Sequence, residues 1–121
     1  MQTLKLVSRL FPEVKSGDKT STIRWRETRI EPGYFRYECQ DGQNASIVVW
    51  VWRCTDMPLS EAAGFLGKEA DWPPAVMLEG MREHYPDIQW SDVVQVIEHE
   101  SPQQTDLRVE FDKGVHGGGR R

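Results

Sequence analysis

Alternating apolar and polar residues predict several short β-strands along this chain. The dipeptide Asp41-Gly42 separates two runs rich in β-branched and aromatic residues, which is the signature of a tight antiparallel hairpin. In the run that follows the turn, both alternating faces are apolar, so we expect a central strand that is buried on both sides. The expected strands cover residues 4–7, 20–25, 34–40, 45–54, 93–99 and 107–111.

Three segments carry helix signals instead. Residues 10–16 form a brief helix or turn before Gly17, and residues 58–66 form a helix that stops at Gly67. In residues 74–84, Met77, Leu78 and Met81 recur at one-turn spacing, which suits a helix packed on a sheet. Short strands interrupted by two or three short helices predict the α+β class, with a mixed sheet curled into a small β-barrel.

The length and composition indicate one small domain. A chain of 121 residues with 38% hydrophobic content can build a single core, which we place in residues 1–112. The glycine-rich, basic tail at 113–121 is expected to be disordered. The longest apolar run, residues 47–52, is too short to span a bilayer, and no leader pattern opens the chain. We therefore expect a cytoplasmic protein without membrane partners.

Charge is segregated along the sequence. The net charge of -4 argues against a broad, non-specific nucleic-acid binder, because such proteins normally carry a basic excess. A local positive cleft remains compatible with this balance, since basic residues gather early and acidic residues crowd the later half. The early basic residues are Lys15, Lys19, Arg24, Arg26 and Arg29.

The cysteine and histidine pattern gives little support to a disulfide or a zinc site. Cys39 and Cys54 fall at positions that cannot easily face each other across a hairpin, so reduced, buried thiols are expected. His84 and His99 are expected at the ends of secondary-structure elements without a catalytic role. No pair of cysteines or histidines shows metal-ligand spacing, so no metal is expected.

The segment Gly17 to Arg24 has an unusual polar density for a strand. Because strand side chains alternate, Thr20, Thr22 and Arg24 are expected on one face, with Ser21 on the other. Such a face can bind phosphate or carbonyl oxygen, and a lysine such as Lys19 can activate a neighbouring hydroxyl as a nucleophile. The competing interpretation is structural, because threonines are common in strands and Lys and Arg often only solvate an edge.

A second candidate region lies in the loop before the expected helix at 74–84. Glu69 and Asp71 are candidates for a carboxylate that orients the lysine or handles a leaving group's proton. Trp72, in the same polar loop, is the candidate for an exposed wall on which a base can stack. Solvated loop charges and a core tryptophan are the alternatives.

The motif residues resemble those of the ASCH domain family. The resemblance covers roughly residues 4–100 and implies a β-barrel related to the PUA domain of RNA-modifying enzymes. It rests on Gly17-x-Lys19-Thr20-x-Thr22-Ile23-Arg24, Pro32-Gly33 before a strand, Tyr85-Pro86, and the strand at 94–98.

The resemblance also implies an activity. The small bacterial family members most similar to this chain are amidohydrolases that remove the acyl group from N4-acetylcytidine and related N4-acylcytosines. Carried over, Lys19 is the base, Thr22 the nucleophile and Glu69 the third catalytic residue. An ungapped count back from Tyr85-Pro86 reaches Ala70, so Asp71 is an alternative to Glu69.

The same resemblance implies the substrate contacts. Arg24, Ser21 or a backbone N–H is expected to hold the oxyanion, and Trp72 to stack on the cytosine. No metal or organic cofactor is required, and the expected partner is a small nucleoside.

Other ASCH proteins suggest different functions for the same cleft. In an RNA-binding module or ribonuclease, Lys19 and Arg24 would contact phosphates and Thr22 would position the backbone. A non-catalytic module that senses a ligand is a third alternative. Deacylation of a free nucleoside needs a closed pocket of nucleoside size. RNA binding instead needs an open groove, and the affinity falls steeply with salt.

Overall fold

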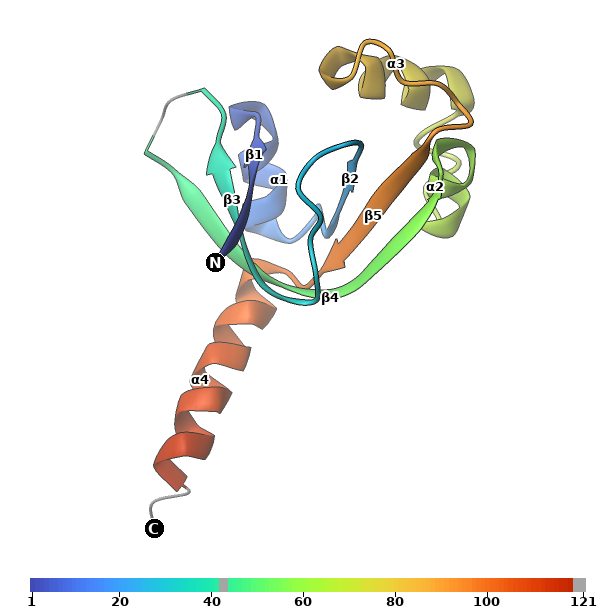
Figure 1. Ribbon diagram of the computed structural model, residues 1–121. Coiled ribbons are helices and arrows are strands. Elements are labelled where there is room, and N and C mark those ends of the chain that lie inside the picture. The colour runs from blue at the N-terminus through green and yellow to red at the C-terminus, as the bar shows by residue number, and fades with distance from the viewer. Residues whose placement is uncertain (42–43, 119–121) are drawn as a thin grey trace. The chain divides into compact units, whose positions relative to one another are not determined.

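The computed structural model describes residues 1–41 and 44–118 of the chain (Figure 1). Within these residues the fold is mixed, with five strands, one 3-10 helix and four α-helices. The elements in chain order are β1 (Gln2–Leu6), η1 (Ser8–Leu10), α1 (Phe11–Ser16), β2 (Ser21–Arg24), β3 (Gly33–Cys39), β4 (Ser46–Pro58), α2 (Leu59–Phe65), α3 (Pro74–His84), β5 (Val93–His99) and α4 (Pro102–Gly118).

The strands form one mixed sheet in the order β1-β3-β4-β5-β2. Strand β1 runs parallel to β3, with Gln2 opposite Phe35, and β3 runs antiparallel to β4, with Gly33 opposite Val51. The predicted pairing of β3 with β4 and the central place of β4 are confirmed, as is the α+β class. The turn that joins β3 to β4 includes residues 42 and 43, which lie outside the described residues.

Residue contacts divide the chain into two compact units, each assembled from separate stretches of sequence. The first unit contains residues 1–21, 30–53 and 98 onward, and the second contains 22–29 and 54–97. The chain changes unit within β2, after residue 29, within β4 and within β5.

The core of the first unit lies on the inward face of its strands. Phe35 and Tyr37 of β3 and Val49 and Val51 of β4 are fully buried, as expected for alternate residues of paired strands. Val14 of α1 is also fully buried, so this short helix contributes to the core.

The second unit has its own hydrophobic cluster. It contains Met57, Leu59, Ala62, Ala63, Met77, Ile88, Val94 and Val96, drawn from the end of β4, from α2, α3 and β5, and from the segment before β5. Ile23 of β2 and the adjacent Trp25 pack against this cluster. Because side chains alternate along a strand, Thr22 and Arg24 point away from it.

The predicted strand at 107–111 is wrong, because these residues lie within α4. The helix begins with a reciprocal cap: Ser101 Oγ accepts a hydrogen bond from Gln104 N (3.1 Å), and Gln104 Oε1 accepts one from Ser101 N (2.9 Å). Pro102 occupies the first helical position, where it loses no hydrogen bond. The predicted disorder of residues 113–121 overlaps the end of this helix and stays a prediction for residues 119–121, which lie outside the described residues.

The prediction that β4 is buried on both faces is also wrong. Ile47, Val49 and Val51 are buried, but on the other face Trp50 is half-buried and Trp52 is 50% exposed. The Arg53 guanidinium covers the Trp52 ring at 4.7 Å, so an exposed aromatic is shielded by a cation.

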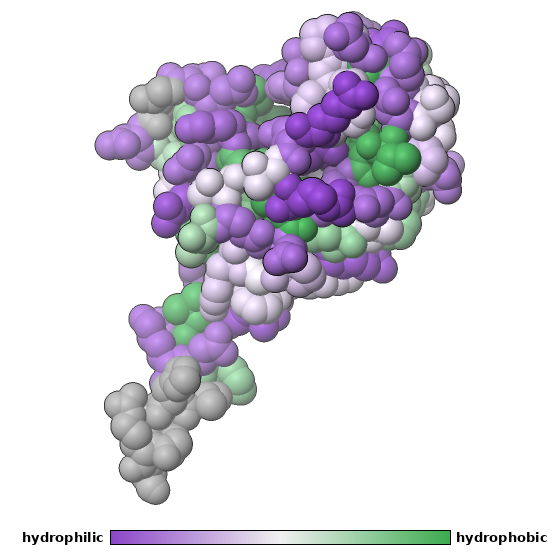
Figure 2. Space-filling view, in the orientation of Figure 1, coloured by the Kyte–Doolittle hydropathy of each residue, from purple (hydrophilic) through white to green (hydrophobic). Residues whose placement is uncertain are grey.

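Other sequence predictions concern chemistry and surface. Cys39 and Cys54 are free cysteines; Cys39 is buried as predicted, but Cys54 is only half-buried. Among the described residues, no helix is both long and apolar enough to cross a membrane. The face of the molecule in Figure 2 is mostly hydrophilic, with hydrophobic residues in separate patches that include parts of α4. On that helix, Leu107 and Phe111 are 71% and 70% exposed.

Candidate active site

Strand β2 places the central residues of the sequence motif in a buried setting. Thr22 is 5% exposed and Ser21 is 9% exposed. Ile23 anchors the strand to the core of the second unit, which leaves Thr22 and Arg24 together on the opposite face. The predicted shared face is therefore confirmed for Thr22 and Arg24, whereas Thr20 lies before β2 and is exposed.

Arg24 bonds directly to the hydroxyl of Thr22. Its Nε donates a hydrogen bond to Thr22 Oγ1 at 2.8 Å, and the arginine side chain is only 11% exposed. A hydroxyl that accepts from a guanidinium still has its own proton to give away. When that proton leaves, the fixed positive charge stabilises the alkoxide, and the effect is strong because little water screens it.

The Glu27 carboxylate contacts the Arg24 guanidinium and also accepts a hydrogen bond from a tyrosine hydroxyl. Glu27 Oε2 lies 3.5 Å from Arg24 Nη1 and accepts a hydrogen bond from the Tyr85 hydroxyl. Burial, with the Glu27 hydrogen bond as a second cause, raises the pKa of Tyr85 to about 12, so Tyr85 stays protonated and donates. Tyr85 also packs edge-on against Trp25, with ring centroids 6.0 Å apart. The order of donors is Tyr85 to Glu27, then Arg24 to both Glu27 and Thr22.

Sequence reasoning missed Glu27 and the role of Tyr85 in this chain of contacts. Glu27 falls in a charged segment without periodicity, and Tyr85 is separated from it by 58 positions. The only available signal was an arginine and a glutamate three residues apart, which is common in solvated segments.

The remaining arginine of this turn serves a different purpose. Arg26 has a left-handed φ of 57°, which is unusual for a residue with a side chain. Its guanidinium carbon lies over the Trp25 ring, 4.3 Å from the ring centroid. This cation–π contact accounts for the position of the Arg26 side chain, which is exposed. The hydrogen bond to Thr22 comes from Arg24.

Lys19 and Ser21 belong to the first unit. Lys19 Nζ donates a hydrogen bond to the Ser21 carbonyl oxygen at 2.7 Å, and its backbone N–H donates to the Glu13 carbonyl at 2.9 Å. The lysine is half-buried. Its ammonium group is therefore held over the backbone of the motif, where Ser21 contributes its carbonyl oxygen.

His99, for which the sequence predicted no catalytic role, lies next to the start of the motif. Its backbone N–H donates to the Thr20 carbonyl oxygen at 2.9 Å, which joins β5 to the start of the motif. The imidazole is 1% exposed; Nδ1 lies 2.8 Å from the Glu100 carbonyl oxygen and Nε2 lies 2.8 Å from the Tyr37 hydroxyl. Because a carbonyl only accepts, Nδ1 carries the proton and Nε2 accepts from Tyr37.

This environment keeps His99 neutral. Burial is the main cause that lowers the pKa of His99 to about 4, and the positive charge of Lys19 lowers it further. A buried neutral imidazole with both nitrogens hydrogen-bonded is a structural element of the first unit.

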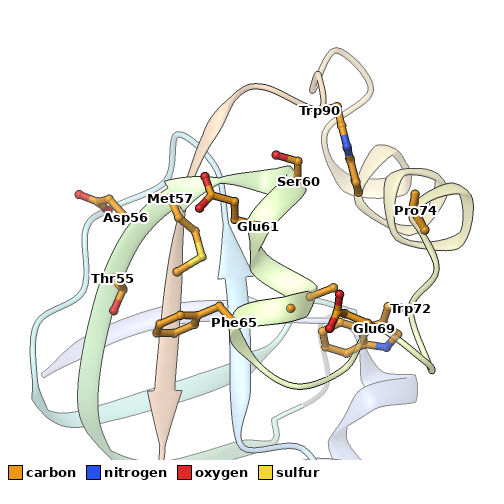
Figure 3. A pocket seen from close by; sticks show the side chains of 12 residues that line it. Thr55, Asp56, Met57, Ser60, Glu61, Phe65, Glu69, Trp72, Pro74 and Trp90 are labelled. Atoms are coloured by element: carbon orange, nitrogen blue, oxygen red, sulfur yellow. The ribbon is translucent and has the colours of Figure 1, made fainter.

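Glu69 and Trp72 lie in the second unit and line one pocket, with a volume of about 650 Å³ (Figure 3). Glu69 and Asp71 are exposed, while Trp72 is half-buried and packs on the core cluster. Of the described residues, Thr22 and Arg24 do not line this pocket. The structure thus brings Thr22 and Arg24 together, and separately Glu69 and Trp72.

In the described part of the chain, no group of three or more His, Cys, Asp or Glu side chains is placed to hold a metal ion.

A scan against protein-family models, a search of curated proteins and a search of solved structures each found no match for the chain.

Proposed function

We propose that this protein is an amidohydrolase that removes the acyl group from N4-acetylcytidine or related N4-acylcytosine nucleosides, with Thr22 as the nucleophile. The observation that carries the proposal is the 2.8 Å hydrogen bond from Arg24 Nε to the buried Thr22 Oγ1. A threonine that only filled a strand position would not need a buried guanidinium on its hydroxyl oxygen. The resemblance to ASCH amidohydrolases, stated above, supplies the substrate class, and it also suggests that the mixed sheet belongs to a PUA-like barrel.

The reaction is an acyl transfer in two halves. As Thr22 Oγ1 attacks the acyl carbonyl carbon, its proton passes to Lys19, which in this scheme acts as general base after its ammonium group has lost a proton. Arg24 stabilises the negative charge that develops on the attacking and carbonyl oxygens. The bond from carbon to N4 then breaks, N4 takes up the proton that Lys19 accepted, and cytidine leaves the acyl-threonine ester.

Water completes the cycle. Water attacks the ester carbonyl carbon and the ester bond breaks. One proton of the water returns to Thr22 Oγ1, and the acyl group leaves as acetic acid, which ionises to acetate and a proton in solution. A carboxylate from Glu69 or Asp71 handles the leaving-group proton in this scheme.

The decisive experiment follows cytidine release from N4-acetylcytidine by the purified full chain. We expect turnover by the parent protein, a loss of about 1,000-fold or more in kcat for Thr22→Ala, and a loss of about 100-fold for Lys19→Ala. Thr20→Ala is the matched control, since Thr20 is an exposed threonine of the same motif and should retain activity. An inactive parent protein, or full turnover by both variants, contradicts the proposal.

The third catalytic residue is assigned by a second pair of variants. Glu69→Gln and Asp71→Asn each remove one charge from the same loop with little change in volume. Loss of turnover in Glu69→Gln alone assigns Glu69, and loss in Asp71→Asn alone assigns Asp71. Unchanged turnover in both variants means that neither carboxylate takes part.

A further inference from the structure

The pocket that holds Glu69 and Trp72 has a chemistry that the proposed hydrolysis does not explain. It lies entirely within the second unit, between the end of β4, helix α2, the loop 66–73, the start of α3 and Trp90. Its volume of about 650 Å³ falls in the range of small-molecule sites. Figure 3 shows Ser60 and Glu61 on α2, with Glu69 and Trp72 on the loop that follows.

The charged groups in this pocket are all negative. Three carboxylates line it, from Asp56, Glu61 and Glu69, and no Lys, Arg or His of the described residues joins them. Asp56 is already neutralised, because Arg29 Nη2 bonds its two carboxylate oxygens at 2.9 and 2.8 Å. The two glutamates therefore set the charge that an occupant meets.

The walls of the pocket are apolar and aromatic. Phe65, Trp72 and Trp90 line it together with Met57, and both tryptophans pack on the hydrophobic core, which fixes their rings. Aromatic faces attract cations, and they also cover the methylene groups of a ligand. A small hydrated inorganic ion would gain nothing from such walls.

Glu69 lines the pocket beside Gly64 of α2. A Cβ built on Gly64 would lie 3.4 Å from Glu69 Cδ and 3.5 Å from Oε2, which is ordinary van der Waals contact, so the Glu69 carboxylate lies close against this helix. Glu61 belongs to the first turn of the same helix, and Glu69 follows its end. The two carboxylates thus approach the pocket from opposite ends of α2.

We propose that this pocket binds a linear aliphatic diamine or polyamine. The ammonium groups pair with Glu61 and Glu69, and the methylene chain lies against Trp72, Trp90 and Phe65. N4-acylcytosines are neutral, so this ligand is distinct from the proposed substrate. The inference goes beyond the proposed function and requires no turnover.

The test is direct binding to the full chain by isothermal titration calorimetry, with diaminopentane as the probe and the uncharged pentanediol as its control. We expect saturable binding of the diamine with Kd below about 1 mM, and none of the diol. Glu61→Gln should weaken binding about threefold or more, and Trp72→Leu should weaken it similarly. Glu79→Gln is the matched control, because Glu79 is an exposed glutamate of α3 that does not line the pocket.

Several outcomes overturn the proposal. They are absence of saturable diamine binding, equal binding of the diol, and equal weakening by Glu61→Gln and Glu79→Gln. Glu61 is used because it takes no part in the proposed catalysis, whereas Glu69 is a candidate there. Diamine binding and cytidine release are separate measurements, so either proposal can fail while the other stands.

Discussion

A threonine hydroxyl is a weak nucleophile, so the proposed role of Thr22 depends on which groups contact its hydroxyl oxygen. Arg24 supplies a donor with a permanent charge, and that donor is itself fixed by Glu27, which accepts from Tyr85. An orientation held from two sides needs no rearrangement when charge develops, which is what electrostatic catalysis requires. The planar guanidinium matters here as much as its charge.

The first prediction follows from that planarity. Arg24→Lys keeps a positive charge but cannot bond Thr22 and Glu27 together in one plane. We expect kcat for N4-acetylcytidine to fall by roughly 10- to 100-fold with little change in KM, because the lost contact acts on developing charge. Arg26→Lys, which alters the surface arginine over Trp25, is the control and should keep its kcat. Equal effects of the two substitutions would show that Arg24 has no special role.

The second prediction concerns His99 and pH. Its pKa in the folded protein is about 4, below the ordinary 6.5. Between these two values the unfolded chain binds more protons than the folded one, so stability falls as pH falls through this window. The difference between the two pKa values corresponds to roughly 3 kcal/mol of unfolding free energy. This contribution is fully present at pH values above the unfolded-state pKa of 6.5 and is lost as the pH falls to about 4.

Urea unfolding at several pH values measures this effect. The free energy of unfolding of the parent protein should drop between pH values of about 7 and 4, and His99→Gln should drop less, because glutamine does not titrate. A constant difference between the two proteins across this range would mean that His99 does not set the acid sensitivity.

Part of the candidate site was predictable at this scale because it depends on neighbours in the chain. Strand alternation alone places Thr22 with Arg24, and the structure bears this out. The partners of His99 and Glu27 were not predictable, since Tyr37 lies 62 residues from His99 and Tyr85 lies 58 residues from Glu27. Contacts at such separations depend on how the elements pack, which periodicity does not report.

At the scale of elements, α4 shows how a local signal can outweigh a pattern. Leu107, Val109 and Phe111 alternate and suggested a strand. Ser101 and Gln104, three residues apart before this run, form a capping box, and Pro102 suits the first helical turn. The start signal was present in the sequence, and it identifies the helix better than five alternating residues do. Arg108 then ties the helix to Glu100 at 2.8 Å and covers the Trp50 ring at 4.3 Å.

The third prediction uses two glycines in different elements. Gly17 ends α1 with φ of 88°, and a Cβ there would lie 3.1 Å from Ser101 Cβ. Gly17→Ala should therefore destabilise the fold by about 1 kcal/mol or more, through backbone strain and contact with the segment that starts α4. Gly80 lies inside α3 with open space around its Cα, so Gly80→Ala should stabilise by roughly 0.5 to 1 kcal/mol.

Chemical denaturation of the two variants and the parent protein provides the comparison. Opposite signs for one and the same substitution separate backbone conformation from any general effect of adding a methyl group. A stabilising Gly17→Ala would show that the turn between α1 and the motif tolerates an ordinary conformation.

At the scale of the whole molecule, the net charge helps to distinguish the two proposed functions, an N4-acylcytidine amidohydrolase and an RNA-binding module. The chain carries a net charge of -4, so a nucleic-acid strand meets overall repulsion even where arginines are concentrated. Two of the early arginines are also engaged within the protein: Arg24 with Thr22 and Glu27, and Arg29 with Asp56. The clustering of basic residues could be predicted from the sequence. Which of them form ion pairs within the protein could not, because these pairs depend on the fold.

The last prediction turns that balance into a measurement. N4-acetylcytidine is uncharged, so kcat/KM for its hydrolysis should change less than about twofold between low and physiological salt. An RNA site that neutralises about three phosphates would lose affinity roughly 20-fold over a fourfold rise in salt, because bound counterions are released. Turnover and fluorescence anisotropy with a labelled single strand, measured in the same buffers, compare the two directly. Tight RNA binding that falls steeply with salt, alongside absent turnover, would favour the RNA-binding alternative, since only phosphate contacts produce that slope.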